Sequence, residues 1–549
     1  MLALSSEMGQ LHPAVAHRTR KPHTRSRAGC MTCRRRRVRC DGVQPSCSQC
    51  AKGGRFCDFG TPVLPLRDRR TMPLPGQQAW VVHSNQLQLI LWNAPLEIDP
   101  VDPFDSFAVQ MPFKSKELLH YFHQSLDAFD SSSSPKKTNI LPFVVHHPDA
   151  LRNTMLVAGT HYAWIVGDMR AYEPAFLHHK IETIKLLNEW LENPLSDSFT
   201  TVMRNIATLC LTECSLGNMA AAETHLDGLM TIMDLHRPLE GNLSAHTGFD
   251  EELAYRYLIM TYHSVHGIKG RIHGSETLTN MLSGQKSVDF PKLVSLLHRW
   301  HEKDIGCLEE RLKAMGLFPF FFGALPPKAK FHDIDGLPMV ECLRTLTNLT
   351  QPRKRKQVNC DPGWVWMGGS ASRLDLAIVD AHIGSLFDTA TPRNDSTYQG
   401  FVGSWASVTL AAGLYLHSVL HLWNGGEPIE HRLFRRVLTI LMRDLERSIS
   451  ELKDPMSSTF WFWKVFVGAY SLERHQLYAN DPTVQVLESY FDGFVRSWSQ
   501  ASRTTTWQEA KARLLRIAWY TESNEDEGQR IWERALRLDR DRAGHCCTQ

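Results

Sequence analysis

Residues 30–40 read CMTCRRRRVRC and residues 47–57 read CSQCAKGGRFC, so the spacing C-x2-C-x6-C occurs twice, with six residues between the copies. Zinc in proteins takes four ligands in a tetrahedron. Six cysteines are too few for two separate sites, but they suffice if two thiolates bridge both metals. The repeat therefore predicts one compact cluster of two zinc ions, whose halves are related by a pseudo-two-fold axis.

The two halves of the repeat differ in charge. Each C-x2-C pair can start a short helix whose free N–H groups point toward sulfur. The second half carries only Lys52 and Arg55 as basic residues, whereas the first half carries Arg34, Arg35, Arg36, Arg37 and Arg39. We therefore expect the first half to face a polyanion and the second half mainly to complete the metal site.

The cysteine spacing, the basic run before Cys40, the acidic Asp41 after it and Pro45 in the connecting loop resemble the fungal Zn₂Cys₆ binuclear-cluster transcription factors. This resemblance implies that Cys30 and Cys47 bridge the two zinc ions. It further implies that Cys33 and Cys40 complete one site. The last two ligands, Cys50 and Cys57, would then complete the other.

The same resemblance implies a nuclear protein that binds double-stranded DNA through an arginine-rich helix in the major groove. Arg36 and Arg37 are expected at base edges, because arginine matches guanine O6 and N7 with two hydrogen bonds. The residues expected at phosphates are Arg34, Arg35, Arg39 and Lys52. Members of the family usually have lysine at the position of Arg37 and read a CGG-type triplet, so a CGG-like triplet is the expected target.

The charge of the chain is divided unevenly. Although the formal charge of the 549 residues is only +3, residues 1–60 carry +9 and the remainder carries −6. A basic head on a mildly acidic body points to nucleic acid as the partner of the head. Six of the 13 cysteines are concentrated in the repeat. No signal-peptide core precedes them, so an intracellular, reducing compartment is expected, in which clustered cysteines favour metal over disulfides.

The composition divides the chain into five segments. A basic tail at 1–27 has little to bury and is expected to be disordered. The cluster domain is placed at 28–60 and a proline-rich linker at 61–112, where the prolines preclude the long helix of a coiled coil. A helical regulatory domain is placed at 113–522 and an acidic and basic C-terminal tail at 523–549. Any homodimer must then form without a coiled coil after the cluster.

From residue 113 onward the apolar residues recur at three- and four-residue intervals, as in amphipathic helices that bury one stripe. Examples are Leu118, Leu119, Phe122, Leu126 and Phe129, then Ile181, Ile184, Leu187 and Leu191, then Leu226, Leu229, Ile232 and Met233. Alternating patterns typical of strands are scarce. The fold class is therefore mostly α, with a small zinc cluster, a linker and a large all-α domain.

Three stretches of this region resemble helices of the fungal-specific transcription factor regulatory domain, namely 222–229, 460–469 and 507–519. The resemblance implies a regulatory role with transcriptional coregulators as partners. Near the end, an acidic patch from Glu522 to Glu527 precedes Ile531 and Trp532. This composition fits either an activation segment or an amphipathic terminal helix.

No run reaches the roughly 18 uninterrupted apolar residues of a membrane helix. The closest stretch, Leu410 to Trp423, is interrupted by His417 and His421 and reads as a buried helix. The spacing of His263, His266 and His273 lacks cysteine or carboxylate partners, so no second metal site is assigned. Phosphate-binding, zinc-protease and nucleophile-elbow motifs are missing, and we expect no enzyme.

The sequence therefore predicts a sequence-specific regulator of RNA polymerase II transcription, of a kind that often controls metabolic or biosynthetic gene clusters. Two alternatives stay open. One is a zinc-dependent protein-interaction or scaffold protein whose DNA affinity is incidental. The other is an enzyme with a DNA-targeting head, which a deep pocket with convergent ionisable groups in residues 113–520 would support.

Overall fold

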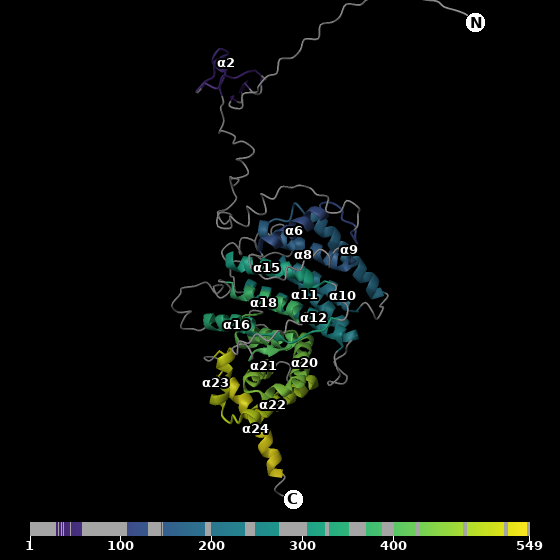
Figure 1. Ribbon diagram of the computed structural model, residues 1–549, viewed down its shortest axis with the longest axis vertical. Coiled ribbons are helices and arrows are strands. Elements are labelled where there is room, and N and C mark those ends of the chain that lie inside the picture. The colour runs from purple at the N-terminus through teal and green to yellow at the C-terminus, as the bar shows by residue number, and fades with distance from the viewer. Residues whose placement is uncertain are drawn as a thin grey trace, which may run out of the picture. The chain divides into compact units, whose positions relative to one another are not determined.

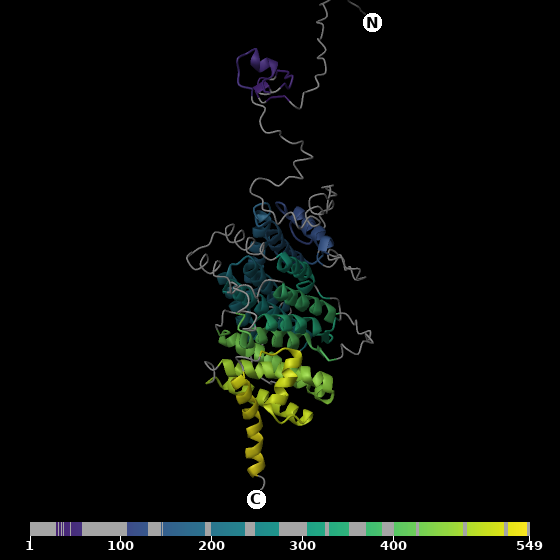
Figure 2. The ribbon, with the colours of Figure 1, turned by 90° about the vertical axis from the view of Figure 1, so that its left-hand side faces the viewer.

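A computed structural model describes residues 29–57, with gaps at 31, 34–35, 37 and 44, and most of residues 107–545. Within the second range, the described parts are 107–129, 144, 146–192, 199–236, 248–273, 305–323, 325, 329–350, 369–386, 400–423, 428–475, 480–520 and 525–545. The chain divides into two compact units, residues 1–84 and 85–549 (Figures 1 and 2). The expected tail at 1–27 and nearly all of the expected linker lie outside the described residues.

The first unit is small and has cysteine as its core. Its one helix with described bounds, α2 (Ser48–Ala51), follows Cys47, whose side chain accepts a hydrogen bond from the N–H of Cys50. Thr32 and Cys33 are also helical, as expected for a C-x2-C pair. In the described part of this unit, the buried apolar residues are all cysteines.

The second unit is built almost entirely from helices, which confirms the expected fold class. Its first half contains α6 (Ser115–Phe129), α8 (Pro148–Val166), α9 (Glu173–Glu192), α10 (Phe199–Ser215), α11 (Met219–His236), α12 (Phe249–His273), α15 (Ile305–Phe321), α16 (Leu337–Thr350) and α18 (Ser370–Ser385). The second half contains α19 (Trp405–Leu414), the π-helical turn η3 (Tyr415–Val419), α20 (His431–Arg447), the 3-10 turn η5 (Ile449–Lys453), α21 (Pro455–Arg474), α22 (Pro482–Ser502), α23 (Trp507–Ile517) and α24 (Glu525–His545).

Helices α6, α8 and α9 lie at one end of this unit and α22–α24 at the other, while α15 lies beside α6 and α8 (Figure 1). Helix α10 packs against α8, α11 and α12, and α15 packs against α18. The described residues contain one sheet, in which β1 (Ile334–Asp335) pairs antiparallel with β2 (Val402–Gly403).

Helix α21 forms the centre of the C-terminal half. The side chains of Phe460, Trp461, Phe462 and Trp463 are fully buried, because neighbouring helices cover every side of α21. Helix α19 and the turn η3 are buried throughout, as expected for the stretch that begins at Leu410. Helices that are apolar on all sides belong in the interior of a large domain.

Helix α24 takes up most of the segment that was expected to be a C-terminal tail. It packs against α21, α22 and α23, and it buries Ile531, Trp532 and Ala535. This is the amphipathic helix that the sequence offered as one reading of the acidic patch. The structure therefore joins these residues to the helical unit.

The expected apolar stripes are buried in two of three cases. Leu226, Leu229, Ile232 and Met233 are all buried, and so are Leu118, Leu119 and Phe122, while the side chains of Leu126 and Phe129 lie outside the described residues. The stripe on α9 is a correction, because only Leu187 is buried while Ile181 and Leu191 are half exposed. Helix α9 instead turns a face with Phe176, His179, Thr183 and Leu187 toward its neighbours α8 and α10.

Candidate metal centre

The six repeat cysteines gather in one place, and none of them forms a disulfide. Five are buried and Cys57 is partly buried. In the described part of this unit, the buried apolar groups are all small thiols, which bury little surface. Such a unit needs metal–sulfur bonds to hold its fold, because a core this small cannot do so.

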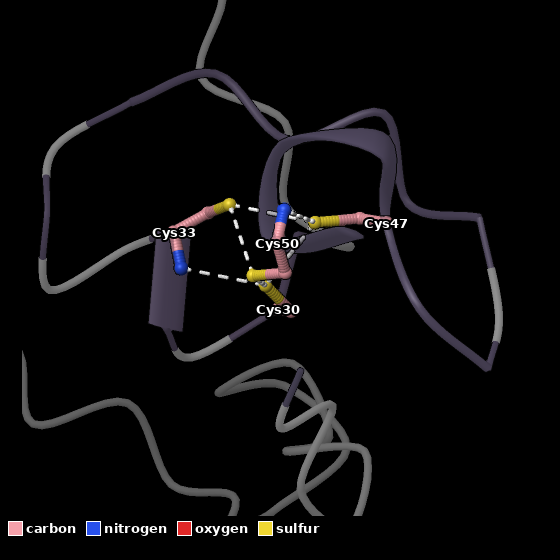
Figure 3. Close-up of side chains that lie close together, drawn as sticks. All are labelled: Cys30, Cys33, Cys47 and Cys50. Atoms are coloured by element: carbon pink, nitrogen blue, oxygen red, sulfur yellow. Dashed lines mark hydrogen bonds between the residues drawn. The ribbon is translucent and has the colours of Figure 1, made fainter. Parts of the chain in front are cut away.

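The sulfur atoms of the two C-x2-C pairs form a compact group (Figure 3). Cys30 lies 3.7 Å from both Cys47 and Cys50, and Cys33 lies 3.5 Å from Cys47 and 3.8 Å from Cys50. With zinc–sulfur bonds of about 2.3 Å, the edge of a tetrahedron is about 3.8 Å. The donor set and its spacing therefore fit zinc.

The two halves repeat one another's hydrogen bonds at an offset of 17 residues. The N–H of Cys33 points to the sulfur of Cys30 at 3.3 Å, and the N–H of Cys50 points to Cys47 at 3.4 Å. The outer cysteines match in the same way, since the N–H of Cys30 donates to Cys40 at 3.3 Å and that of Cys47 donates to Cys57 at 3.2 Å. These pairs confirm the expected pseudo-two-fold repeat.

The thiols of the cluster differ in acidity. Burial raises the pKa of Cys33 to about 12, and it also raises the pKa values of Cys50 and Cys57. Burial acts in the same direction on Cys30 and Cys47, but hydrogen bonds from the N–H groups of Cys33 and Cys50 and from neighbouring thiols outweigh it, so these two pKa values are lowered. The first cysteine of each half is thus the one most readily present as thiolate, the form that binds metal.

The basic residues surround this core on the outside. Arg36, Arg39, Lys52 and Arg55 are exposed. The N–H of Arg36 donates to the carbonyl of Thr32 at 3.3 Å, so Arg36 continues the helical turn that starts at the first C-x2-C pair. The other expected DNA contacts, Arg34, Arg35 and Arg37, lie outside the described residues.

Two polar contacts that the sequence did not reveal hold the loops of the cluster. The carboxylate of Asp41 accepts hydrogen bonds from the N–H of Ser48, at 3.1 Å for its nearer oxygen, and from the Ser48 hydroxyl. The Thr32 hydroxyl donates to the carbonyl of Phe56 at 2.9 Å and so joins the two halves. An acidic residue before a helix was a usable signal for Asp41, since carboxylates favour helix N-termini.

Among the described residues of the helical unit, no three or more His, Cys, Asp or Glu side chains lie close enough together to hold a metal ion. The buried His263 has a structural role, because its Nε2 lies 2.9 Å from the carbonyl oxygen of Thr409 and its ring packs against Trp423. Within the described part of the chain, no helix combines the length and apolar character needed to span a membrane.

A small basic unit with a cysteine core, followed in the chain by a large helical unit, defines a zinc-cluster protein with an accessory helical domain. Comparison with known families narrows this class. Residues 28–63 match the fungal Zn(2)-Cys(6) binuclear cluster domain, and residues 117–299 match the fungal specific transcription factor domain. Two segments of the chain thus match domains of the fungal Zn(2)-Cys(6) transcription factors, and the matched cluster domain is one that binds two zinc ions.

Curated relatives match over short stretches. The aspercryptin biosynthesis cluster-specific transcription regulator atnN of Emericella nidulans is 46% identical over 66 residues, which cover 12% of this chain and 10% of the relative. A Zn(2)-C6 fungal-type transcription factor of Gibberella zeae is 51% identical over 43 residues, or 8% of this chain and 9% of the relative. The C6 finger domain transcription factor hasF of Aspergillus fumigatus is 50% identical over 42 residues, which cover 8% of this chain and 6% of the relative.

The chain thus spans a tenth or less of the length of these three relatives. No solved structure matches it. Both matched families and the named relatives are transcription factors rather than enzymes, in agreement with the expectation from the sequence.

Proposed function

We propose that this chain is a nuclear, sequence-specific DNA-binding regulator of RNA polymerase II transcription. The observation that carries the proposal is the exposed basic side of the cysteine unit, where Arg36 extends from a helical turn anchored to the metal site. A helical turn presenting arginine can enter the major groove, and the fixed cluster behind it keeps the side chain from folding back.

The proposed metal site uses all six repeat cysteines, with Cys30 and Cys47 as bridging ligands. Cys33 and Cys40 complete one zinc site, and Cys50 and Cys57 complete the other. The N–H hydrogen bonds accepted by the sulfur atoms of Cys30 and Cys47, and the lowered pKa values of these two thiols, support this division of roles. Two zinc ions held by these six cysteines would supply the structural cross-links that the described core lacks.

The proposed DNA contacts divide by role. Arg36 and Arg37 read base edges in a CGG-like triplet, and the remaining contacts, Arg34, Arg35, Arg39 and Lys52, hold phosphates. The exposure of Arg36, Arg39 and Lys52 supports this assignment. The helical unit would supply regulation through coregulators and self-association. The name of one relative, the aspercryptin cluster regulator, favours a biosynthetic gene cluster as the target.

The proposal is tested with the full-length chain by measuring zinc per chain and enrichment from a randomised duplex library at two salt concentrations. Two zinc ions and an enriched G/C-rich triplet are expected, with affinity that falls as salt rises. Arg55→Ala, an exposed basic residue outside the proposed base contacts, is the matched control for an Arg36→Ala/Arg37→Ala variant. If the chain bound zinc but enriched no sequence, the proposal of sequence-specific DNA binding would be refuted.

One observation favours a second function for the same unit, a zinc-dependent protein contact. Phe56 is 86% exposed and Val43 is 56% exposed, although both lie on a unit otherwise rich in charge. Large apolar side chains in the open are typical of protein-binding surfaces. A Phe56→Ala variant that loses reporter activation while keeping its DNA affinity would support this role.

A further inference from the structure

The side chain of Asp41 lies beside the cysteine cluster. A carboxylate oxygen of Asp41 and the sulfur atoms of Cys40 and Cys47 all lie within 4.8 Å of one another. Asp41 is exposed, whereas both cysteines are buried. This carboxylate therefore borders the metal centre from the solvent side.

The carboxylate of Asp41 is already engaged by Ser48. Its two oxygens accept hydrogen bonds from the N–H of Ser48 at 3.1 and 3.3 Å, and one of them also accepts from the Ser48 hydroxyl. In the proposed cluster, six thiolates with two bridges fill the four positions of both zinc ions. A seventh ligand has no position there, so Asp41 acts beside the metal ions rather than on them.

The contact closes the loop that joins the two halves of the cluster. Asp41 directly follows the outer ligand Cys40, and Ser48 directly follows Cys47. Gly42 has a φ angle of 75°, in the left-handed region, and so lets the chain turn immediately after Asp41. Hydrogen bonds to an ionised carboxylate are about twice as strong as those between neutral groups. The loop is therefore held at the two points where it meets the metal ligands.

We propose that Asp41 is a positioning residue for zinc binding, which acts by fixing the position of Cys47 through Ser48. Because Cys47 is the proposed bridge, its position affects both zinc sites. Without the contact, zinc binding has to order the loop as well, and the conformational entropy lost in doing so lowers the affinity. Groups that orient metal ligands from outside the coordination sphere typically change metal affinity by about 10- to 100-fold.

This role rests on the proposed function, because it needs the metal centre described there. It adds a residue outside the six ligands that controls how tightly the metal is held. Zinc affinity is measured without DNA, so its outcome is separate from that of the DNA-binding experiment.

The test is zinc affinity of the full-length chain, measured by competition with a chromophoric chelator, together with the absorption spectrum of the cobalt(II)-loaded chain. Asp41→Ala removes all of these hydrogen bonds, Ser48→Ala removes only the one from the hydroxyl, and Ser48→Thr restores a hydroxyl. Ser46→Ala is the matched control, because Ser46 is also an exposed serine next to Cys47. Thermal unfolding of each variant checks that the helical unit is intact.

The proposal expects zinc binding weakened by about tenfold or more in Asp41→Ala and by less in Ser48→Ala, with wild-type affinity in Ser48→Thr and Ser46→Ala. The cobalt(II) spectrum of Asp41→Ala at saturating metal should also differ from wild type, because a displaced Cys47 changes the geometry around both ions. If Asp41→Ala takes up no metal at all, a loss in Ser48→Ala that Ser48→Thr restores supports the proposal.

Wild-type affinity in Asp41→Ala overturns the proposal. An equal loss in Ser46→Ala also overturns it, since any change in the loop would then have the same effect. An unchanged cobalt(II) spectrum in Asp41→Ala would mean that Asp41 does not position a ligand, and it overturns the proposal too. A wild type that binds no zinc would refute the metal centre of the proposed function, and this role with it.

Discussion

The sulfur atoms of Cys30 and Cys47 lie 3.7 Å apart, although 17 residues separate the two cysteines in the chain. Each is the first cysteine of its half, and each accepts a hydrogen bond from the N–H three residues later. The two residues are therefore equivalent by the pseudo-two-fold repeat and adjacent at its centre. We propose that this pair is shared by two metal ions, and that Cys40 and Cys57 each serve one.

Replacement of a bridging cysteine should remove more zinc than replacement of an outer one. Cys47→Ser takes a ligand from both sites, so we expect less than about one zinc ion per chain. Cys57→Ser takes a ligand from one site, and we expect about one ion to stay. Elemental analysis of the purified full-length variants measures this, with Cys342→Ser in the helical unit as the control. Equal losses for the two variants would argue against bridging by Cys47.

Arg36 and Lys52 should affect DNA binding in different ways. Arg36→Ala removes a proposed base contact, so we expect a loss of about 1–3 kcal/mol on the preferred triplet and reduced discrimination. Lys52→Ala removes a proposed phosphate contact, so we expect a similar loss of affinity on all sequences. The salt dependence of binding should fall by about one released counterion. Titrations of both variants at several salt concentrations separate the two cases. If Arg36→Ala lost the same affinity on all sequences, this residue would contact the DNA backbone rather than a base edge.

Gly468 on α21 should not tolerate a methyl group. A Cβ atom there would lie 2.3 Å from the ring of Phe491 on α22, which is far inside van der Waals contact. Although alanine favours helices by about 1 kcal/mol over glycine, we expect Gly468→Ala to lower the free energy of unfolding by about 1–3 kcal/mol. Gly493→Ala on α22 is the control, because its Cβ would meet nothing within 4 Å. Denaturant unfolding should show a lower free energy of unfolding for Gly468→Ala and no such loss for Gly493→Ala.

The helical unit should lose stability in mild acid through His263. Burial lowers the pKa of this histidine from 6.5 to about 4, so the folded state favours the neutral ring. Between these values the unfolded chain binds more protons, and stability therefore falls as the pH drops from about 6.5 toward 4. The loss attributable to this residue is up to about 3 kcal/mol.

Urea unfolding at pH 7 and pH 4.5 measures this effect. His263→Gln should show a smaller fall between the two pH values than wild type, because the titrating group is gone. His146→Gln, at an exposed position, should follow wild type. An equal fall for His263→Gln would mean that other groups account for the acid sensitivity.

The metal centre could be predicted because its constraints are local and chemical. Tetrahedral coordination fixes how many sulfur atoms are needed, and the spacing of six cysteines in 28 residues leaves one compact arrangement. The mostly helical fold class could also be predicted from the sequence, since an apolar period of three to four residues is a property of each segment by itself. The contacts of Asp41 with Ser48 and of Thr32 with Phe56 were less accessible, because they depend on how the loops return to the cluster.

The sequence by itself determined the zinc-binding repeat, its basic side and the helical character of the long domain, because coordination and helix periodicity act over a few residues. The tertiary structure decided which apolar stripes are buried. Leu187 and Ile181 belong to one periodic pattern on α9, yet α8 and α10 cover only the side with Leu187 and leave Ile181 exposed. It also decided that α24 packs on α21–α23, and that Gly468 allows Phe491 to approach. These outcomes depend on neighbours far away in the chain, and periodicity within one helix carries no information about them.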